Sequence, residues 1–199
     1  MSDQSSFVSL IDRLRRGDNE AARSLLTRYE PVLRRIVAMR LLDRKLRGIV
    51  DTEDICQSVL GSFFVRLGLG QYEIVDESDL LRLLATMVRN KVVSKKRRRT
   101  LEKREDVQIF IKDRMTENRA GSETTPSATL SYEELVREAE GLLSPEERQL
   151  IALRKQGVGW IEIGNRLGED PECLRKRMAR TMDLVIEQLG LDEIRRGKK

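Results

Sequence analysis

The chain has 199 residues, enough for two small domains with separate cores. Charged residues make up 36% of it and aromatic residues only 4%, a balance typical of small helical domains. No window approaches the roughly 18 apolar residues that a membrane span needs, and the first residues lack the features of a signal peptide, so we expect a cytoplasmic protein. The sequence contains no His, and we expect no metal site and no cofactor. Cys56 and Cys173 stand far apart inside helical patterns, and we expect both to be packing residues.

The first hundred residues repeat apolar side chains every three or four positions, and no segment alternates as a strand would. Gly17 is expected to end the first helix, and Asp18 to cap the second. The fourth helix is expected to begin at Ser78 or Asp79, after a segment interrupted by two glycines. The pattern predicts helices over residues 7–14, 18–37, 51–67 and from 78 into the basic run beyond it.

The expected third helix carries a polar stripe opposite its apolar face. Asp51, Asp54, Gln57, Ser58 and Gly61 follow three- and four-residue spacing, so they share one exposed side. An acidic and amide stripe of this kind can bind another protein. It can equally be a solvated face in which Asp51 caps the helix and stabilises its dipole.

A strongly basic segment continues the fourth helix. Residues 89–104 hold nine Lys or Arg against one Glu, while the whole chain has a net charge of +5. Localised positive charge of this kind favours a nucleic-acid backbone as the partner. The glycine-containing loop that precedes the helix carries Tyr72, which could stack on one unpaired base of a single strand. A grip on duplex phosphates and a merely solvated face remain alternatives.

Residues 113–131 read as a linker between two domains. Seven of the sixteen residues from Thr116 to Ser131 are Ser or Thr, and the segment has no apolar face to bury. We therefore expect an all-α protein with two small helical domains, at residues 1–112 and 132–199, joined by a flexible linker.

The second domain has the pattern of a helix-turn-helix motif. Ser144 is expected to cap a helix in which Glu147 completes a capping box. Gly168 supplies a tight turn, and Asp170 caps the helix that follows. Gly164 stands where the two helices of the motif would cross, and its lack of a side chain permits close approach.

The last helix of this motif is the expected DNA-reading element. We expect Leu174, Met178, Leu184 and Val185 to dock it onto the core. Arg and Glu side chains suit hydrogen bonding to base edges, although a guanidinium can equally grip phosphate, and a helical hairpin with a solvated basic face is the alternative. The side chains expected to face DNA are Glu172, Arg175, Lys176, Arg177 and Arg180.

In order and content these parts resemble a bacterial extracytoplasmic-function (ECF) sigma factor, over nearly the whole chain. GDNEAARSLLTRYEPVLRRIV is similar to the opening helices of sigma domain 2, and DTEDICQSVLGSFF to the acidic motif that docks on the clamp helices of RNA polymerase. LLRLLATMVRNKVVSKKRRR resembles the helix that binds the -10 promoter element, and LSPEERQLIALRKQGVGWIEIGNRLGEDPECLRKRMART resembles sigma domain 4, which binds the -35 element.

The resemblance implies a sigma factor that binds core RNA polymerase and promoter DNA, assists promoter melting and catalyses nothing itself. An anti-sigma protein is a possible further partner. The loop from Gly70 to Asp76 would receive a flipped base. Residues implied in polymerase binding are Asp51, Asp54 and Gln57. Residues implied at the -10 element are Arg89, Asn90, Lys91, Lys95, Lys96 and Arg97.

Three positions depart from the family pattern. Leu83 stands where Trp is common, Ser94 where Asp is common and Gly164 where Ala is usual. The first two change the expected -10 contacts, whereas the third exchanges one small residue for another. A stand-alone helix-turn-helix regulator is the main alternative, but the chain offers no clear apolar surface for dimerisation. An enzyme acting on nucleic acid is a third reading, for which a paired nucleophile and base are lacking.

Overall fold

A computed structural model describes residues 2–41, 52–110 and 131–191 of the chain, without the side chains of residues 2–5 and 96–110. Within those ranges all regular structure is helical, and the expectation of an all-α fold is confirmed. No helix in the described part is long and apolar enough to cross a membrane. The helices are α1 (Ser2–Arg15), α2 (Asn19–Arg40), α3 (Thr52–Gly68), α4 (Glu77–Phe110), α5 (Tyr132–Gly141), α6 (Pro145–Lys155), α7 (Trp160–Leu167) and α8 (Pro171–Gln188).

Helices α1 to α4 form the N-terminal half, which we define as residues 2–110. The core lies where α2, α3 and α4 meet, and it is filled by side chains such as Leu33, Phe63 and Leu84. Asp18 caps α2 as predicted, because its carboxylate accepts hydrogen bonds from the backbone of Glu20 and Ala21. Apolar spacing therefore accounts for how these helices pack, and the cap accounts for where α2 begins.

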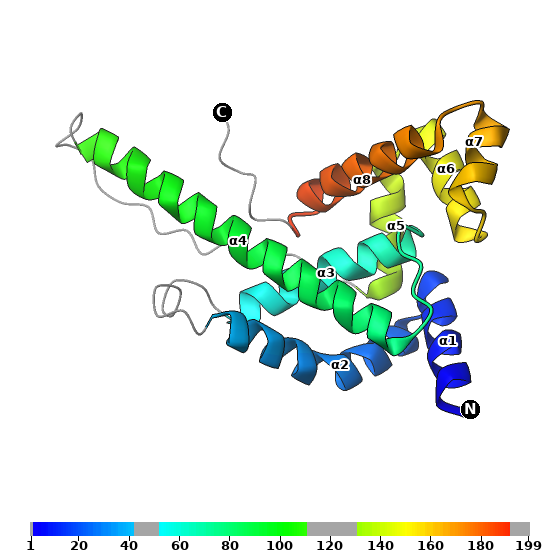
Figure 1. Ribbon diagram of the computed structural model, residues 1–199, viewed down its shortest axis with the longest axis horizontal. Helices are drawn as coiled ribbons and strands as arrows, with labels where there is room; N and C mark the ends of the chain where they lie inside the picture. Colours follow the sequence, from blue (N-terminus) through cyan, green and yellow to red (C-terminus); the bar gives the residue numbers. More distant parts are fainter. Residues whose placement is uncertain (1, 42–51, 111–130, 192–199) are drawn as a thin grey trace.

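Helix α4 is the longest element and projects beyond the other helices (Figure 1). It begins at Glu77, one residue before the earlier of the two predicted starts. The carboxylate of Asp76 accepts a hydrogen bond from the backbone N–H of Asp79 at 2.8 Å, which satisfies one of the free donors of the first turn. This side chain explains the earlier start.

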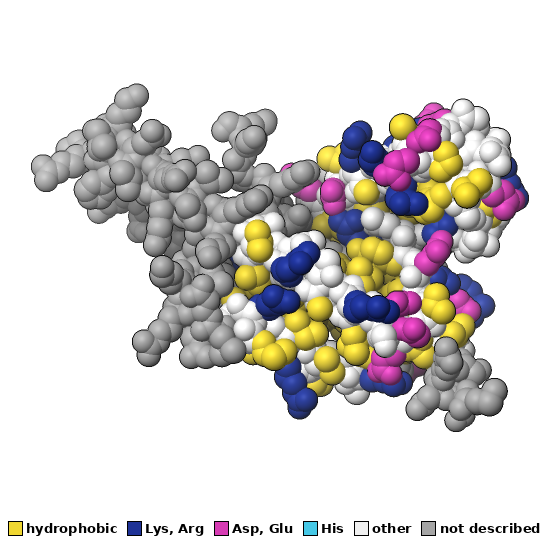
Figure 2. All heavy atoms as spheres, in the orientation of Figure 1, with side chains coloured by type: hydrophobic (Ala, Val, Ile, Leu, Met, Phe, Trp, Pro, Cys, Tyr) yellow, Lys and Arg dark blue, Asp and Glu magenta, His cyan; other side chains and the backbone are white. Residues whose placement is uncertain are grey.

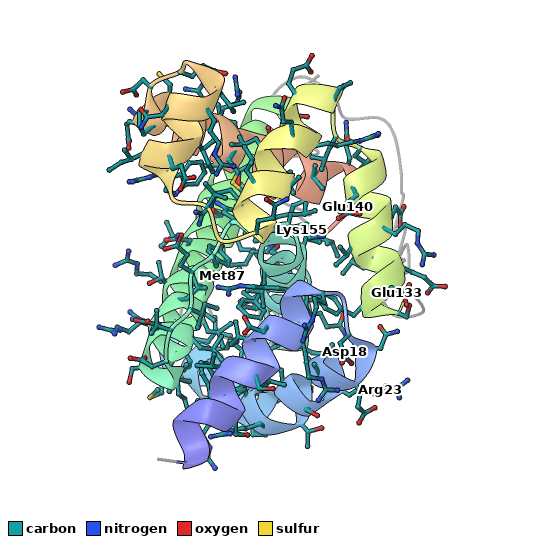
Figure 3. All side chains as sticks on the ribbon, turned by 90° about the vertical axis from the view of Figure 1, so that its right-hand side faces the viewer. Asp18, Arg23, Met87, Glu133, Glu140 and Lys155 are labelled. Carbon is teal, nitrogen blue, oxygen red and sulfur yellow. The ribbon has the colours of Figure 1, made fainter. Side chains whose placement is uncertain are left out.

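Helices α5 to α8 form the C-terminal half, which we define as residues 131–191. Ser144 and Glu147 make the predicted capping box at the start of α6. Between α5 and α6, Lys155 Nζ lies 2.7 Å from Glu140 Oε1 (Figure 3). Local capping therefore starts α6, and one ion pair links α6 to α5.

The two halves pack directly against each other. Helix α5 lies against α3 and against the turn between α1 and α2, where Figure 3 shows Glu133 close to Asp18. The backbone N–H of Glu133 donates to Asn19 Oδ1 at 3.0 Å. The hydroxyl of Tyr132 is buried and donates to the carbonyl of Leu14 at 2.7 Å. The expected linker lies outside the described residues except for Ser131, and the domain division at 1–112 and 132–199 stays a prediction.

Candidate protein and nucleic-acid interfaces

The polar stripe of α3 is exposed only at its N-terminal end. Asp54 is 57% exposed and Gln57 is exposed beside it, while Asp51 lies outside the described residues. Glu53, which the sequence reasoning did not single out, adds a carboxylate there and lies 3.5 Å from Arg34 of α2. The exposed end of the stripe is therefore acidic and can contact a basic or amide-rich partner.

The other end of the stripe is covered. Ser58 and Gly61, both expected to be exposed, lie under Leu191, the residue at which the described C-terminal half ends. The hydroxyl of Ser58 donates to the carbonyl of Leu191 at 2.7 Å, and Gly61 is buried. The expectation that Gly61 faces solvent is wrong, because the C-terminal half packs on this side of α3.

The basic residues of α4 do not share a single face. Arg89 and Asn90 are exposed, but Lys91 is only 9% exposed. Lys91 follows Leu80 by eleven positions, so the helical repeat brings it back to within about 20° of the buried side. Lys91 therefore lies apart from the exposed pair with which the sequence grouped it.

Lys95 also faces the protein. It follows buried Val88 by seven positions, and its Nζ lies 3.6 Å from Asp54 Oδ2. A residue expected at the -10 element is thus paired with one expected at polymerase, so the two predicted sites meet between α3 and α4. The side chains of Lys96 and Arg97, also predicted there, lie outside the described residues.

The loop between α3 and α4 is held tightly by aromatic packing. The ring of Tyr72 stacks on Phe63 with centroids 6.4 Å apart, and its hydroxyl lies 3.9 Å from the sulfur of Met87. Burial raises the pKa of the Tyr72 hydroxyl. In this structure Tyr72 is therefore engaged within the protein, and a base could stack on it only after rearrangement.

Arg154 of α6 fastens the same loop to the C-terminal half. Its side chain is 2% exposed, forms an ion pair with Glu73 and donates to the carbonyl of Val158 at 2.7 Å. Its guanidinium also lies over the ring of Trp160, 4.7 Å from the centroid. Sequence reasoning missed this residue. The available signal was its register, since Arg154 follows Leu150 by four positions and so lies on the buried side of α6.

The turn between α7 and α8 has the predicted helix-turn-helix geometry. Gly168 ends α7 with φ 68°, and the carboxylate of Asp170 accepts from the backbone of Cys173 at 2.8 Å to cap α8. A Cβ placed on Gly164 would lie 2.7 Å from the carbonyl oxygen of Glu169, closer than side-chain carbons come to oxygen atoms in proteins. Gly164 thus permits the crossing of the two helices, as its position in the sequence indicates.

The outward face of α8 carries mixed charge, and Figure 2 shows basic and acidic side chains next to one another over this helix. Arg175 Nη1 lies 3.4 Å from Glu172 Oε2, and Lys176 Nζ lies 3.7 Å from Glu172 Oε1. Arg180 is exposed and forms no ion pair with the described residues. The exposed side chains on this face can therefore contact a duplex; they are Glu172, Arg175, Lys176 and Arg180.

Arg177 differs from its neighbours. Its two terminal nitrogens lie 2.8 and 3.0 Å from the carboxylate of Glu169, and its Nε is buried. This paired geometry fixes Glu169, in the turn, to the first turns of α8. Arg177 would have to release Glu169 before it could contact DNA.

The chain matches the family model described as ECF sigma factor over residues 4–185. This range covers α1 to α8 apart from the first residues of α1 and the last residues of α8. It belongs to the ECF sigma factor family. A search of curated proteins found no match. This ECF sigma factor therefore has a role in transcription, and members of its family in general bind core RNA polymerase, promoter DNA and anti-sigma proteins.

In the described part of the chain, no group of three or more His, Cys, Asp or Glu residues is placed to hold a metal ion. Of the two cysteines, Cys56 is buried as expected but Cys173 is exposed, so the expectation for Cys173 is wrong. Cys173 precedes the buried Leu174 by one position, and about 100° of helical rotation turns it toward solvent.

Proposed function

We propose that this ECF sigma factor binds core RNA polymerase, directs it to promoters through -10 and -35 elements, and assists melting of the -10 segment. The observation that carries the proposal is the family match across α1 to α8, because a stand-alone regulator would share only the helix-turn-helix part. The domain division into residues 1–112, 113–131 and 132–199 belongs to this proposal. So does a cytoplasmic location.

Polymerase docking is assigned to the acidic end of α3. Asp54 and Gln57 project from two consecutive turns, and Asp51 would extend the same stripe by one more turn. Carboxylates exposed in this way pair favourably with basic residues of a partner and increase the rate of association. An anti-sigma protein could mask the same surface.

Promoter binding is assigned to two basic regions. Arg89 and Asn90 are exposed on α4, with Lys91, Lys95, Lys96 and Arg97 further along the same helix. At the -35 element, Arg175, Lys176 and Arg180 would contact the duplex together with Glu172, and Arg177 would join them on release from Glu169. The protein acts as a specificity subunit in this proposal, and polymerase supplies the catalysis.

Run-off transcription tests the proposal with purified core polymerase and a library of promoters. Addition of the protein should produce specific transcripts that core enzyme alone does not make. A double variant, Asp54→Ala with Gln57→Ala, should reduce both the transcripts and the capture of core polymerase by about tenfold, since it removes a charged and an amide contact.

A matched control is Glu20→Ala with Thr27→Ala, which changes an acidic and a polar side chain on the exposed side of α2. This control should leave polymerase capture unchanged. Unaltered capture by the Asp54 and Gln57 variant would remove the docking assignment. Absence of specific transcripts from any promoter with the wild-type protein would contradict the proposed function itself.

A further inference from the structure

The polar stripe of α3 continues past Gly61 in the same helical register. Gly61 is followed by Val65 and Gly68 at spacings of four and three residues, so all three lie on the side that begins with Asp54. Two glycines on one side of a helix remove the side chains that would keep another element at a distance. The stripe therefore has an acidic exposed end and a notched end that fits a closely packed neighbour.

The C-terminal half fills both notches. A Cβ on Gly61 would lie 2.9 Å from Leu191 Cδ2, and a Cβ on Gly68 would lie 2.6 Å from Val136 Cγ2. Leu191 is only 4% exposed, and its carbonyl accepts the hydrogen bond from Ser58. Residues from both ends of the C-terminal half thus sit on one side of α3.

Polar contacts flank the two notches. Arg66 Nη2 of α3 lies 2.5 Å from Asp183 Oδ1 of α8, and Arg154 of α6 pairs with Glu73 in the loop between α3 and α4. These pairs join the halves at points separate from the glycine contacts. The closed arrangement therefore rests on complementary shape and complementary charge together.

The covered end of the polar stripe of α3 directly adjoins its exposed end. Gln57, assigned to polymerase docking, is followed directly by Ser58, whose hydroxyl is occupied by Leu191. A stable protein interface buries about 800 Å² on each partner, far more than the area of two side chains. A partner centred on Asp54 and Gln57 would therefore also extend over Ser58 and Gly61, where Leu191 lies.

We propose that the C-terminal half is an intramolecular cover on α3 that competes with core RNA polymerase for the docking stripe. This inference rests on the proposed function, because polymerase is the competitor. Closure removes part of the docking surface, so the apparent affinity for polymerase equals the affinity of the open form multiplied by the fraction of molecules that are open. Polymerase binding in turn releases the C-terminal half, and with it α8, from α3.

The test measures closure and polymerase binding in the same full-length variants. Leu191→Ser removes the apolar contact and leaves α3 untouched, and Gly61→Ala disturbs the same contact from the other side. Closure is followed by energy transfer between a dye on exposed Cys173 and a dye on Thr27→Cys of α2, since Cys56 is buried. Both variants should show altered transfer, and Leu191→Ser should bind core polymerase roughly fivefold to tenfold more tightly.

Leu184→Ser is the matched control, because Leu184 is on α8 but 54% exposed. It should change neither energy transfer nor polymerase affinity. Helical circular dichroism and binding to a -35 duplex show whether Leu191→Ser remains folded. Should that variant lose its fold, Gly61→Ala replaces it in the test, with any gain in affinity supporting the cover.

Three results would overturn the cover. Energy transfer that is the same in all variants would mean that Leu191 does not hold the halves together. Altered transfer with unchanged polymerase affinity would mean that closure exists without competition. Equal gains for Leu191→Ser and Leu184→Ser would mean a general effect of the substitution. Failure of the wild-type protein to bind core polymerase would instead contradict the proposed function.

Discussion

Glu147 shows how one side chain can connect a helix cap to a second helix. Its carboxylate accepts from the backbone of Ser144 at 2.8 Å, at the start of α6, and from the hydroxyl of Thr181 of α8 at 2.5 Å. Partial burial acts to raise the pKa of Glu147, but the hydrogen bonds from Thr181 and Ser144 outweigh it and the pKa is lowered. The ionised form of Glu147 therefore stabilises the C-terminal half.

Glu147→Gln should lower the free energy of unfolding by about 1 kcal/mol at neutral pH, the usual loss for a weakened cap. Because the folded pKa is below the unfolded value of about 4.3, the stabilisation is fully present above the unfolded value and is lost as the pH falls below it and through the folded pKa. The difference between wild type and variant should therefore shrink between about pH 5 and pH 3. Urea unfolding at a series of pH values measures it.

Glu146→Gln provides the comparison, since Glu146 is exposed in the same turn of α6. It should change stability by less than about 0.5 kcal/mol at any of these pH values. A Glu147→Gln variant whose deficit stays constant down to pH 3 would show that the charge of Glu147 contributes nothing.

Several predictions from the sequence about which single side chains are buried or exposed are wrong. Leu184 was expected to dock α8 onto the core, yet it is 54% exposed. It follows buried Leu174 by ten positions, which turns it about 80° away from the buried side, whereas Val185 at eleven positions returns to that side. Helical angles counted from a known core residue would have corrected this assignment and that of Lys91.

At the scale of the elements, the sequence was a better guide. Asp18, Ser144 and Asp170 each cap the helix that they were expected to cap, and Gly168 makes the predicted tight turn. Caps act within one turn of the chain, so their physical cause is contained in a few neighbouring residues. Contacts between distant elements, such as Arg66 of α3 with Asp183 of α8, have no such local signal.

Arg175 and Arg177 of α8, which the sequence grouped together at the DNA, have different contacts in the structure. Arg175→Ala should weaken binding to a -35 duplex by about 1–3 kcal/mol and reduce the preference over a scrambled duplex. Arg177→Ala should instead lower the melting temperature, because the variant leaves Glu169 without its paired contact. Fluorescence anisotropy with matched and scrambled duplexes, together with thermal melting, measures both effects.

The two arginine variants are controls for each other. An equal loss of Arg175→Ala binding on matched and scrambled duplexes would mean that Arg175 contacts phosphates only. A normal melting temperature for Arg177→Ala, with a loss of specific binding, would mean that Arg177 reads DNA and that its pairing with Glu169 is weak.

For the whole molecule, the shared interface predicts that the two halves unfold together. Gly68 and Gly141 each end a helix, but a Cβ on Gly68 would meet Val136 at 2.6 Å whereas a Cβ on Gly141 meets nothing within 4 Å. Gly68→Ala should therefore cost about 1–3 kcal/mol through overpacking. Gly141→Ala should be neutral or slightly stabilising, because Ala favours the helix.

Denaturant unfolding followed by two signals checks this prediction. Helical circular dichroism reports both halves, and the fluorescence of Trp160 reports the C-terminal half. The transitions should coincide in the wild type and in Gly141→Ala, and should separate in Gly68→Ala. Transitions that already separate in the wild type would mean that the halves are not coupled.

The sequence could not have predicted this interface. The reason for a glycine at positions 61 and 68 is the close approach of Leu191 and Val136. These partners lie 130 and 68 positions further along the chain. Helical periodicity describes one element at a time and contains no information about such pairs. The order of the helices was thus predictable, whereas the surface that the C-terminal half covers required the structure.

The position of Trp160 has a practical consequence. It is the single tryptophan of the chain, and its ring lies under the guanidinium of Arg154, which is paired with Glu73 of the other half. A nearby cation alters the emission of an indole ring, so separation of Arg154 from Glu73 changes the charge environment of the only such fluorophore. The unlabelled protein therefore contains its own optical probe of how its halves are joined.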